Sequence, residues 1–104
     1  MAASNVVKFK VKPGGEEEFV RIHEAMFREE PWPGMVQSFL IRTGGNGFCI
    51  VGLWDSVEAL AAGRPRMIAT LDRFRHLLDD LGGGLGVTDP ASGPVVASFP
   101  PPAA

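Results

Sequence analysis

The stretch that decides the fold is Phe48-Cys49-Ile50-Val51-Gly52-Leu53-Trp54-Asp55-Ser56-Val57-Glu58-Ala59-Leu60. Its first half is an unbroken apolar run of the length typical of a buried strand. Asp55 then stands three residues before Glu58, a spacing typical of a helix N-terminus. We therefore expect a strand that is buried and leads directly into a helix.

The residues before this stretch predict its hairpin partner. Residues 35–43 form a second strand, and Gly44-Gly45-Asn46-Gly47 forms the turn, because Gly and Asn tolerate positive φ. A two-residue loop and a four-residue loop give the same register. That register makes three pairs, which are Ile41 with Ile50, Phe39 with Gly52, and Gln37 with Trp54.

The residues before the hairpin predict one strand and one helix. Residues 5–12 alternate between apolar side chains and lysines, which is the period of a strand. Apolar residues in the segment 16–27 recur every three or four positions, as in an amphipathic helix. Three glutamates open this segment, where they suit the positive end of a helix.

The residues after the hairpin predict another helix and a last strand. Gly63 and Pro65 should end the helix that starts near Asp55 and begin a second segment, which continues to about Leu81. Residues 94–99 then read as the final strand.

This order of elements is that of a ferredoxin-like βαββαβ fold. In that α+β fold an antiparallel sheet carries both helices on one face. A chain of 104 residues makes one domain, 1–104. Its core is expected at about 5–99, followed by a Pro/Ala tail at 100–104.

The predicted hairpin is apolar on both faces. Leaving five apolar side chains of the uncovered face in water would forgo on the order of 5–10 kcal/mol, at ~1.5 kcal/mol or more for each. We therefore predict a two-fold homodimer with sheets packed face to face, and the alternative is a monomer with a curled sheet. In the expected register one face carries Phe39, Ile41, Phe48, Ile50 and Trp54, and the other carries Val36, Leu40, Cys49, Val51 and Leu53.

Composition argues against several classes of protein. A formal net charge of −2 gives no electrostatic footprint for nucleic acid or an anionic membrane. No apolar stretch approaches the ~20 residues that span a bilayer. A single cysteine and a start without an apolar signal region favour a cytoplasmic protein. The spacing of the two histidines and the cysteine fits no metal site, and no dinucleotide or phosphate loop is present, so no cofactor is expected.

Two segments resemble the antibiotic biosynthesis monooxygenase (ABM) domain family. Phe9-Lys10-Val11-Lys12-Pro13-Gly14, followed by Glu16-Glu17-Glu18-Phe19, is similar to that family's first strand and helix start. Leu53-Trp54-Asp55-Ser56-Val57-Glu58-Ala59 is similar to its third strand where it enters the second helix. The resemblance covers roughly residues 5–99.

The resemblance implies a dimeric α+β barrel, as the burial argument predicts independently. The family includes small monooxygenases that oxidise aromatic polyketides or quinols without a prosthetic group, haem-degrading enzymes and signal-molecule isomerases. Its polyketide-oxidising members use a Tyr, and this chain contains none. Its haem-degrading members use a Trp on the second helix, where this chain has Gly63, and an Asn on the first strand. Asn5 lies too early on that strand for a firm match.

His23 is the candidate catalytic residue. It falls inside the apolar stripe of the first helix, next to Phe19 and Met26 on the helical wheel. A histidine in this position can face a pocket between helix and sheet and transfer a proton near neutral pH. The alternative is a core histidine satisfied by one backbone carbonyl or one water.

The remaining candidates line the expected pocket. Trp54 could stack on a planar aromatic substrate, or it could be a core aromatic that anchors the helix. Gly52 could leave room for a ligand, admit a close helix or mark a bulge. The complete candidate pocket is His23, Met26, Phe39, Ile50, Gly52 and Trp54.

Other reactive residue types have simpler interpretations. His76 is expected on a solvated helix face near carboxylates. Cys49 has no recognisable base beside it and is expected to be an inert buried thiol. The row Lys8, Lys10 and Lys12 could attract an anionic ligand or could simply be solvated.

Two functions follow from these observations. The first is a cofactor-independent monooxygenase-type oxidoreductase acting on a small aromatic or quinol-like molecule, with His23 removing a substrate proton. The second is a non-catalytic dimeric barrel that binds a small apolar ligand or serves a stress role. A second polar group converging on the pocket would favour the enzyme.

Overall fold

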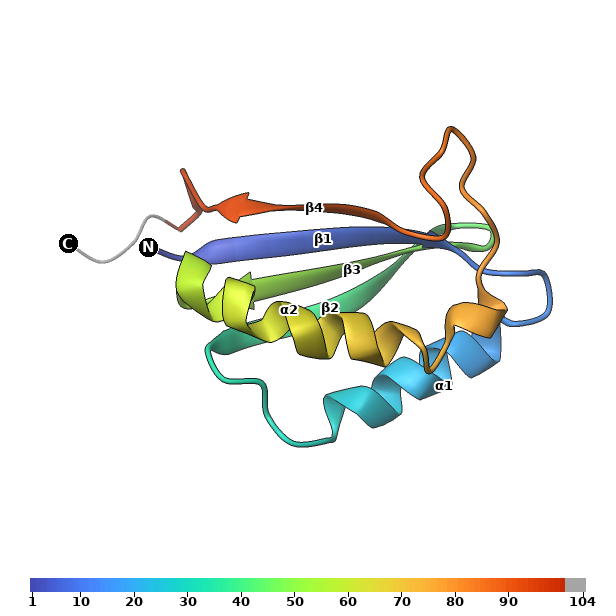
Figure 1. Cartoon of the computed structure of the whole chain (residues 1–104), viewed down its shortest axis with the longest axis horizontal. Coiled ribbons are helices and arrows are strands. Elements are labelled where there is room, and N and C mark those ends of the chain that lie inside the picture. The colour runs from blue at the N-terminus through green and yellow to red at the C-terminus, as the bar shows by residue number, and fades with distance from the viewer. Residues whose placement is uncertain (101–104) are drawn as a thin grey trace.

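The computed structural model describes residues 1–100, so the predicted Pro/Ala tail lies outside the described residues apart from Pro100. Four strands and two helices follow in the order βαββαβ (Figure 1). Between α2 and β4 the chain also makes one short 3₁₀ turn. The elements are β1 (Ala3–Lys10), α1 (Glu16–Phe27), β2 (Met35–Gly44), β3 (Gly47–Trp54), α2 (Val57–Leu71), the 3₁₀ turn (Arg75–Leu77) and β4 (Asp89–Pro94).

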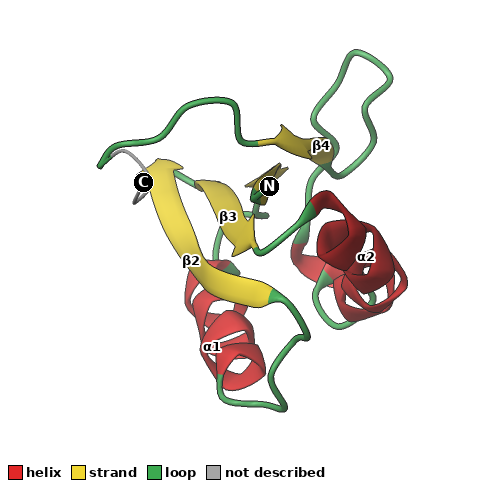
Figure 2. Ribbon diagram, turned by 90° about the vertical axis from the view of Figure 1, so that its left-hand side faces the viewer, coloured by secondary structure: helices red, strands yellow, loops and turns green. Residues whose placement is uncertain are grey.

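The strands form one antiparallel sheet in the order β2-β3-β1-β4. Both helices lie on the same side of this sheet, and no helix covers the other side (Figure 2). The ferredoxin-like fold predicted from the sequence is therefore confirmed. We call the side that faces the helices the inner face and the bare side the outer face.

The predicted hairpin register is wrong by one residue. Gly44 pairs with Gly47 around the two-residue loop, as expected, but a bulge between Arg42 and Gly44 then shifts β2. An extra residue in one strand moves every later side chain to the opposite face. The observed pairs are Ile41 with Cys49, Leu40 with Ile50, Phe39 with Val51, Ser38 with Gly52 and Gln37 with Leu53.

The predicted interruption of the second helix is also wrong. α2 continues through Gly63 and Pro65 and ends at Leu71. The Ser56 hydroxyl caps its start by accepting a hydrogen bond from the Ala59 N–H at 3.0 Å. A proline inside a helix costs roughly 3 kcal/mol. The helix remains intact here because its buried residues are anchored, with Gly63 lying directly against the Trp54 ring.

The helix does not reach Leu81, because the chain after it returns to the end of β1. The Leu77 carbonyl accepts a hydrogen bond from the Lys12 N–H at 2.7 Å. The Asp79 N–H in turn donates to the Lys10 carbonyl at 2.8 Å. These backbone pairings replace the extra helical turns that the apolar spacing predicted.

The last strand lies earlier than predicted. β4 spans Asp89–Pro94 and pairs with β1 as an edge strand, where prolines are tolerated. After it, the Val95 N–H donates a hydrogen bond to the carbonyl of Ala2, the residue before β1. The apolar residues that suggested a strand at 94–99 are largely in water, with Val96 90% and Phe99 96% exposed.

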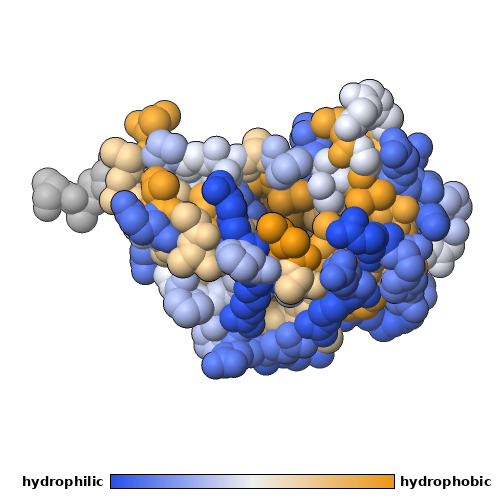
Figure 3. Space-filling view, viewed as in Figure 1, coloured by the Kyte–Doolittle hydropathy of each residue, from blue (hydrophilic) through white to orange (hydrophobic). Residues whose placement is uncertain are grey.

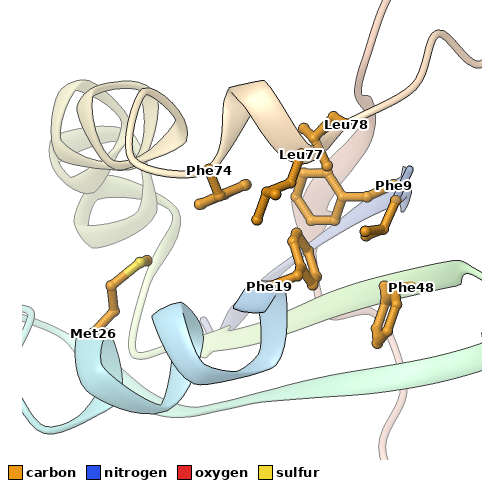
Figure 4. Packing of buried hydrophobic residues seen from close by; sticks show 8 residues of the cluster. Phe9, Phe19, Met26, Phe48, Phe74, Leu77 and Leu78 are labelled. Atoms are coloured by element: carbon orange, nitrogen blue, oxygen red, sulfur yellow. The ribbon is translucent and has the colours of Figure 1, made fainter. Parts of the chain in front are cut away.

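The core consists of two clusters on the inner face. The larger one is aromatic, with ring centroids 5.6 Å apart for Phe9 and Phe19 and 4.9 Å apart for Phe19 and Phe48 (Figure 4). The smaller cluster is centred on Trp54 and Leu60. The two clusters fix β1 and β3 against both helices and leave space between them.

The outer face is apolar and uncovered. Phe39, which pairs with Val51, is 43% exposed, and Ile41, which pairs with Cys49, is 41% exposed. The strand pairing places further apolar residues on the same face, which are Val6, Cys49, Val51 and Leu53. The sequence argument that both faces of the hairpin are apolar therefore holds, although the bulge exchanges which residues of β2 lie on which face.

Candidate functional site

A cavity of about 540 Å³ lies between the inner face of the sheet and the helices. Its lining comes from all four strands, both helices and the loop of residues 28–34. Apolar side chains are visible at the centre of the molecular face seen in Figure 1, with hydrophilic ones around them (Figure 3). A cavity of this size, mainly apolar with few polar groups, is typical of a site for a small organic molecule.

α1 places His23 in the wall of this cavity. The side chain is 1% exposed. Aromatic rings surround it, with centroid distances of 4.5 Å to Phe19, 4.6 Å to Phe74 and 6.5 Å to Phe9. The apolar stripe of α1 thus carries one polar group into the aromatic cluster.

The two nitrogens of His23 have different surroundings. Nδ1 lies 2.9 Å from the Phe19 carbonyl oxygen, and a carbonyl only accepts, so Nδ1 carries the proton. Nε2 is buried and has no hydrogen-bond partner among the described residues. In this tautomer Nε2 holds a free lone pair, and an unpartnered buried nitrogen is costly unless a ligand satisfies it.

The surroundings keep His23 neutral. Burial lowers the pKa of His23 below its usual value of 6.5 because the charged ring would lose its hydration. The hydrogen bond to Phe19 raises the pKa, and the positive charge of Arg73 lowers it. At neutral pH the ring is therefore an uncharged base, ready to accept a proton.

A row of small and polar residues crosses the floor of the cavity. Strand pairing aligns Asn5 with both Ser92 and Gly52, and Gly52 with Ser38. All four line the cavity. The next row on the same face is apolar and contains Val7 and Ile50. The floor therefore has a polar band beside an apolar one.

Asn5 is the central member of this row and is 8% exposed. Its Oδ1 accepts a hydrogen bond from the Trp54 indole Nε1 at 2.8 Å, and its Nδ2 has the Met67 sulfur at 3.6 Å as its contact. A Cβ on Gly52 would collide with Asn5 Oδ1, and one on Gly63 would lie 2.5 Å from the Trp54 ring. Two glycines thus make the Asn5–Trp54 pair sterically feasible.

Two arginines fasten the loop of residues 28–34 over one end of the cavity. The Arg66 guanidinium lies 4.2 Å from the centre of the Trp32 ring and donates to the carbonyls of Glu30 and Pro31. Arg73 binds both carboxylate oxygens of Glu29, at 2.8 and 2.7 Å. This hydrogen bonding lowers the pKa of Glu29.

The structure brings together four of the six predicted pocket residues. His23, Met26, Ile50 and Gly52 line the cavity. Phe39 lies on the outer face instead, because the bulge in β2 shifts it by one residue. Trp54 is fully buried behind the cavity floor, so it supports Asn5 and does not offer a stacking surface.

The other predicted placements can also be compared with the structure. His76 is solvent-facing, as expected, with its Nε2 3.4 Å from a Glu18 oxygen. Cys49 is buried at 8% exposure, within the outer face. Lys8 lies on that same face opposite Cys49, away from the cavity.

Asn5 is a polar cavity residue that is absent from the six predicted pocket residues. Its position near the start of β1 gave no sign that it faces the helices. The alternation of side chains along the strand could have revealed it. Asn5, Val7 and Phe9 are every second residue and therefore lie on one face, so Asn5 shares a face with the core residue Phe9.

The described residues contain neither a cluster of metal ligands nor a membrane-spanning helix. Within residues 1–100, no group of three or more His, Cys, Asp or Glu side chains could hold a metal ion. None of the described helices has the length and apolar character needed to cross a membrane.

Comparison with known proteins gives information about the fold. No family model and no curated protein matches this chain. Solved structures do match, among them SnoaB, a cofactor-independent oxygenase from Streptomyces nogalater, with 19% identity over 95% of this chain and 97% of that chain and a TM-score of 0.64. A protein of unknown function from Nitrosomonas europaea matches with 16% identity, coverage of 98% and 96%, and a TM-score of 0.74.

A third similar structure is a candidate antibiotic biosynthesis monooxygenase from Chloroflexus aurantiacus. Its identity is 16%, it covers 94% of this chain and 96% of that one, and its TM-score is 0.68. Identities at this level support a shared fold only. The structures similar to this chain are consistently ABM domain proteins, and the chain has the fold of that domain.

Proposed function

We propose that this protein is a cofactor-independent monooxygenase-type oxidoreductase that acts on a small aromatic or quinol-like molecule. The observation that carries the proposal is the Nε2 of His23, a neutral and unpartnered base buried in the wall of an apolar cavity. Its fold is shared with SnoaB, a cofactor-independent oxygenase.

The chemistry needs only a base and molecular oxygen. For an anthrone, His23 Nε2 removes one proton of the methylene group and leaves a delocalised carbanion. The carbanion passes one electron to O₂, and the two radicals combine to form a peroxide at that carbon. The peroxide O–O bond then breaks with loss of the second methylene hydrogen. One oxygen atom becomes the new carbonyl and the other leaves as water, so anthrone and O₂ give anthraquinone and H₂O.

Asn5 supplies the second polar group. Its Oδ1 is occupied by the Trp54 indole, so its amide orientation is fixed and its Nδ2 is the group available to a ligand. An N–H aimed at the substrate oxygen would stabilise the negative charge that develops on deprotonation. Asn5 and His23 both line the cavity, which favours the enzyme over a passive binding protein.

The alternative function is a non-catalytic barrel that binds a small apolar molecule. The observation that favours it is the tight aromatic enclosure of His23, since a histidine among Phe9, Phe19 and Phe74 can serve as a core residue. In that case ligand binding would occur without oxygen consumption.

We further propose that the protein is a cytoplasmic homodimer formed by sheet-to-sheet packing. The apolar outer face, with Phe39 and Ile41 each at least 41% exposed, is the surface that a second copy would cover. Cys49 on this face stays reduced in such a compartment.

Oxygen uptake with a panel of anthrones and quinols tests the function. We expect uptake by the parent protein and its loss, by about 10²–10⁴-fold, in His23→Ala. His76→Ala is the matched control, because His76 is solvent-facing and outside the cavity, and it should retain the parent rate. Asn5→Ala should lower the rate of uptake as well.

Two results would contradict the monooxygenase proposal. One is an absence of uptake with every substrate, and the other is an unchanged rate in His23→Ala. Ligand binding without uptake would support the alternative function.

A further inference from the structure

Three arginines on or just after α2 lie close to the cavity, and their partners differ. Arg66 is engaged by two backbone carbonyls and the Trp32 ring. Arg73 is neutralised by Glu29. Arg64 lines the cavity, and its Nη2 donates at 2.8 Å to the Ser92 hydroxyl. Among residues 1–100 no carboxylate lies within ion-pair distance of Arg64.

The position of Arg64 joins it to the polar row of the cavity floor. Ser92, which Arg64 contacts, is the cross-strand neighbour of Asn5. A guanidinium, a hydroxyl and an amide are therefore adjacent at one end of the cavity. All three can donate hydrogen bonds, which is the arrangement that an anion requires.

The acidic residues of the cavity lie at a different place. Glu29 and Glu30 belong to the loop of residues 28–34, where Arg73 holds the Glu29 carboxylate and Arg66 contacts the Glu30 backbone. The charge of Glu29 is thus next to another arginine. The positive charge of Arg64 is left for a ligand.

The distance between the polar end and His23 limits the size of that ligand. The ring of His23 lies beside Phe9, four residues along β1 from Asn5. Four residues of a strand span about 13 Å. A planar molecule of two or three fused rings can therefore contact His23 with one edge while a substituent on its other end reaches Arg64.

We propose that Arg64 binds a carboxylate of the cavity's ligand, so that the preferred ligands are aromatic acids. Ser92 positions the guanidinium, and Asn5 contacts the same end of the ligand. The inference rests on the proposed function only in taking this cavity as the site of reaction. A guanidinium matches a carboxylate because its planar N–H groups can form two parallel hydrogen bonds.

A matched pair of probes tests the proposal by equilibrium binding. The probes are 2-naphthoate and 2-naphthamide, which have the same shape and differ in charge. We expect the parent to bind the naphthoate about tenfold more tightly than the amide at low salt, because the Arg64 guanidinium attracts the carboxylate charge. The preference should not be larger, because Arg64 is exposed and solvent partly screens its charge. Arg64→Gln should remove this preference.

Two further variants separate a specific role from a structural one. Arg64→Lys keeps the charge and should restore part of the preference. Arg21→Gln is the control, because it makes the same change in net charge on the outward side of α1, where Arg21 faces Glu17 at 3.7 Å. It should keep the full preference of the parent.

Three outcomes would overturn the inference. They are equal affinities of the parent for both probes, an unchanged preference in Arg64→Gln, and no binding of either probe. Its failure is distinguishable from failure of the proposed function, because binding is measured without oxygen consumption. If the parent consumes oxygen with neutral anthrones but binds both probes equally, only the role of Arg64 is contradicted. If the parent prefers the naphthoate but consumes oxygen with no substrate, only the monooxygenase function is contradicted.

Discussion

The inner and outer faces of the sheet are built from the same strands and differ in how their apolar surface is covered. The inner face packs against two helices and leaves a cavity with His23 and Asn5 in its lining. The outer face has apolar side chains of similar size, including Phe39 and Ile41, and no helix over them. In the proposed function, the inner face would bind a small molecule and the outer face would pack against a second copy.

This difference shows why a small domain can hold a cavity at all. A cavity reduces the apolar contact that stabilises a chain of 104 residues. Packing of the outer faces of two copies would restore burial without filling the inner one. The site and the assembly are then complementary uses of one sheet, and each can be perturbed separately.

The largest effect is expected on the outer face. Phe39→Glu should convert a dimer into monomers at micromolar concentration, because each copy loses roughly 1.5–3 kcal/mol of apolar burial and gains a buried charge. Light scattering measures the change. Leu85→Glu, a similar apolar-to-acidic change on an exposed loop away from the sheet, should leave the dimer intact.

The parent protein provides the decisive comparison for this prediction. A single species of 11.1 kDa at micromolar concentration would contradict the proposed dimer directly. Dissociation by Leu85→Glu would show that the outer face is not the surface of contact.

An intermediate effect is expected from two strand glycines on opposite faces. Gly52→Ala places a methyl group against Asn5 Oδ1 on the inner face and should destabilise the fold by about 1–3 kcal/mol. Gly93→Ala on the outer face meets no atom within 4 Å and should stabilise the fold by about 0.4–1 kcal/mol. Urea unfolding monitored by circular dichroism measures both. If Gly52→Ala and Gly93→Ala change the free energy of unfolding equally, the predicted difference in packing between the two faces is wrong.

The smallest effect concerns the protonation of His23, which packs against the inner face. The pKa of His23 is lowered in the folded state, so the unfolded chain binds the proton more tightly. The contribution of the neutral His23 ring to the free energy of unfolding is constant above about pH 6.5, the pKa of histidine in the unfolded chain. This contribution is lost as the pH falls below that value. As the pH falls from about 7.5 to about 5.5, the parent should lose more stability than His23→Phe does. Parallel curves of stability against pH for the two proteins would contradict this prediction.

Most of the fold could be predicted from the sequence because apolar periodicity and turn residues are local signals. The hairpin at Gly45-Asn46 and the helix of residues 16–27 belong to this class. The bulge between Arg42 and Gly44 could not be predicted, because no characteristic residue pattern marks it and its position depends on how β2 pairs with β3. The register error then moved Phe39 to the wrong face.

The remaining errors have the same origin in tertiary contacts. Pro65 predicted a break, but the packing of α2 on Trp54 outweighs the local cost. Asp89–Pro94 has weak strand propensity, and pairing with β1 makes it a strand. Within the site, the helical stripe made His23 a candidate, and the structure places it in the cavity wall. Asn5 was missed because its importance comes from Trp54, 49 positions away in the chain.

The two arginine contacts that fasten the loop of residues 28–34 have a consequence for turnover. The Arg73–Glu29 ion pair is exposed, and solvent and salt weaken such a pair. If the cavity binds a ligand, as we propose, displacement of this loop would open the cavity while the sheet and both helices remain folded. The rate of ligand exchange would then depend on the loop more than on the stability of the domain, and we expect it to rise with ionic strength as the Arg73–Glu29 ion pair is screened.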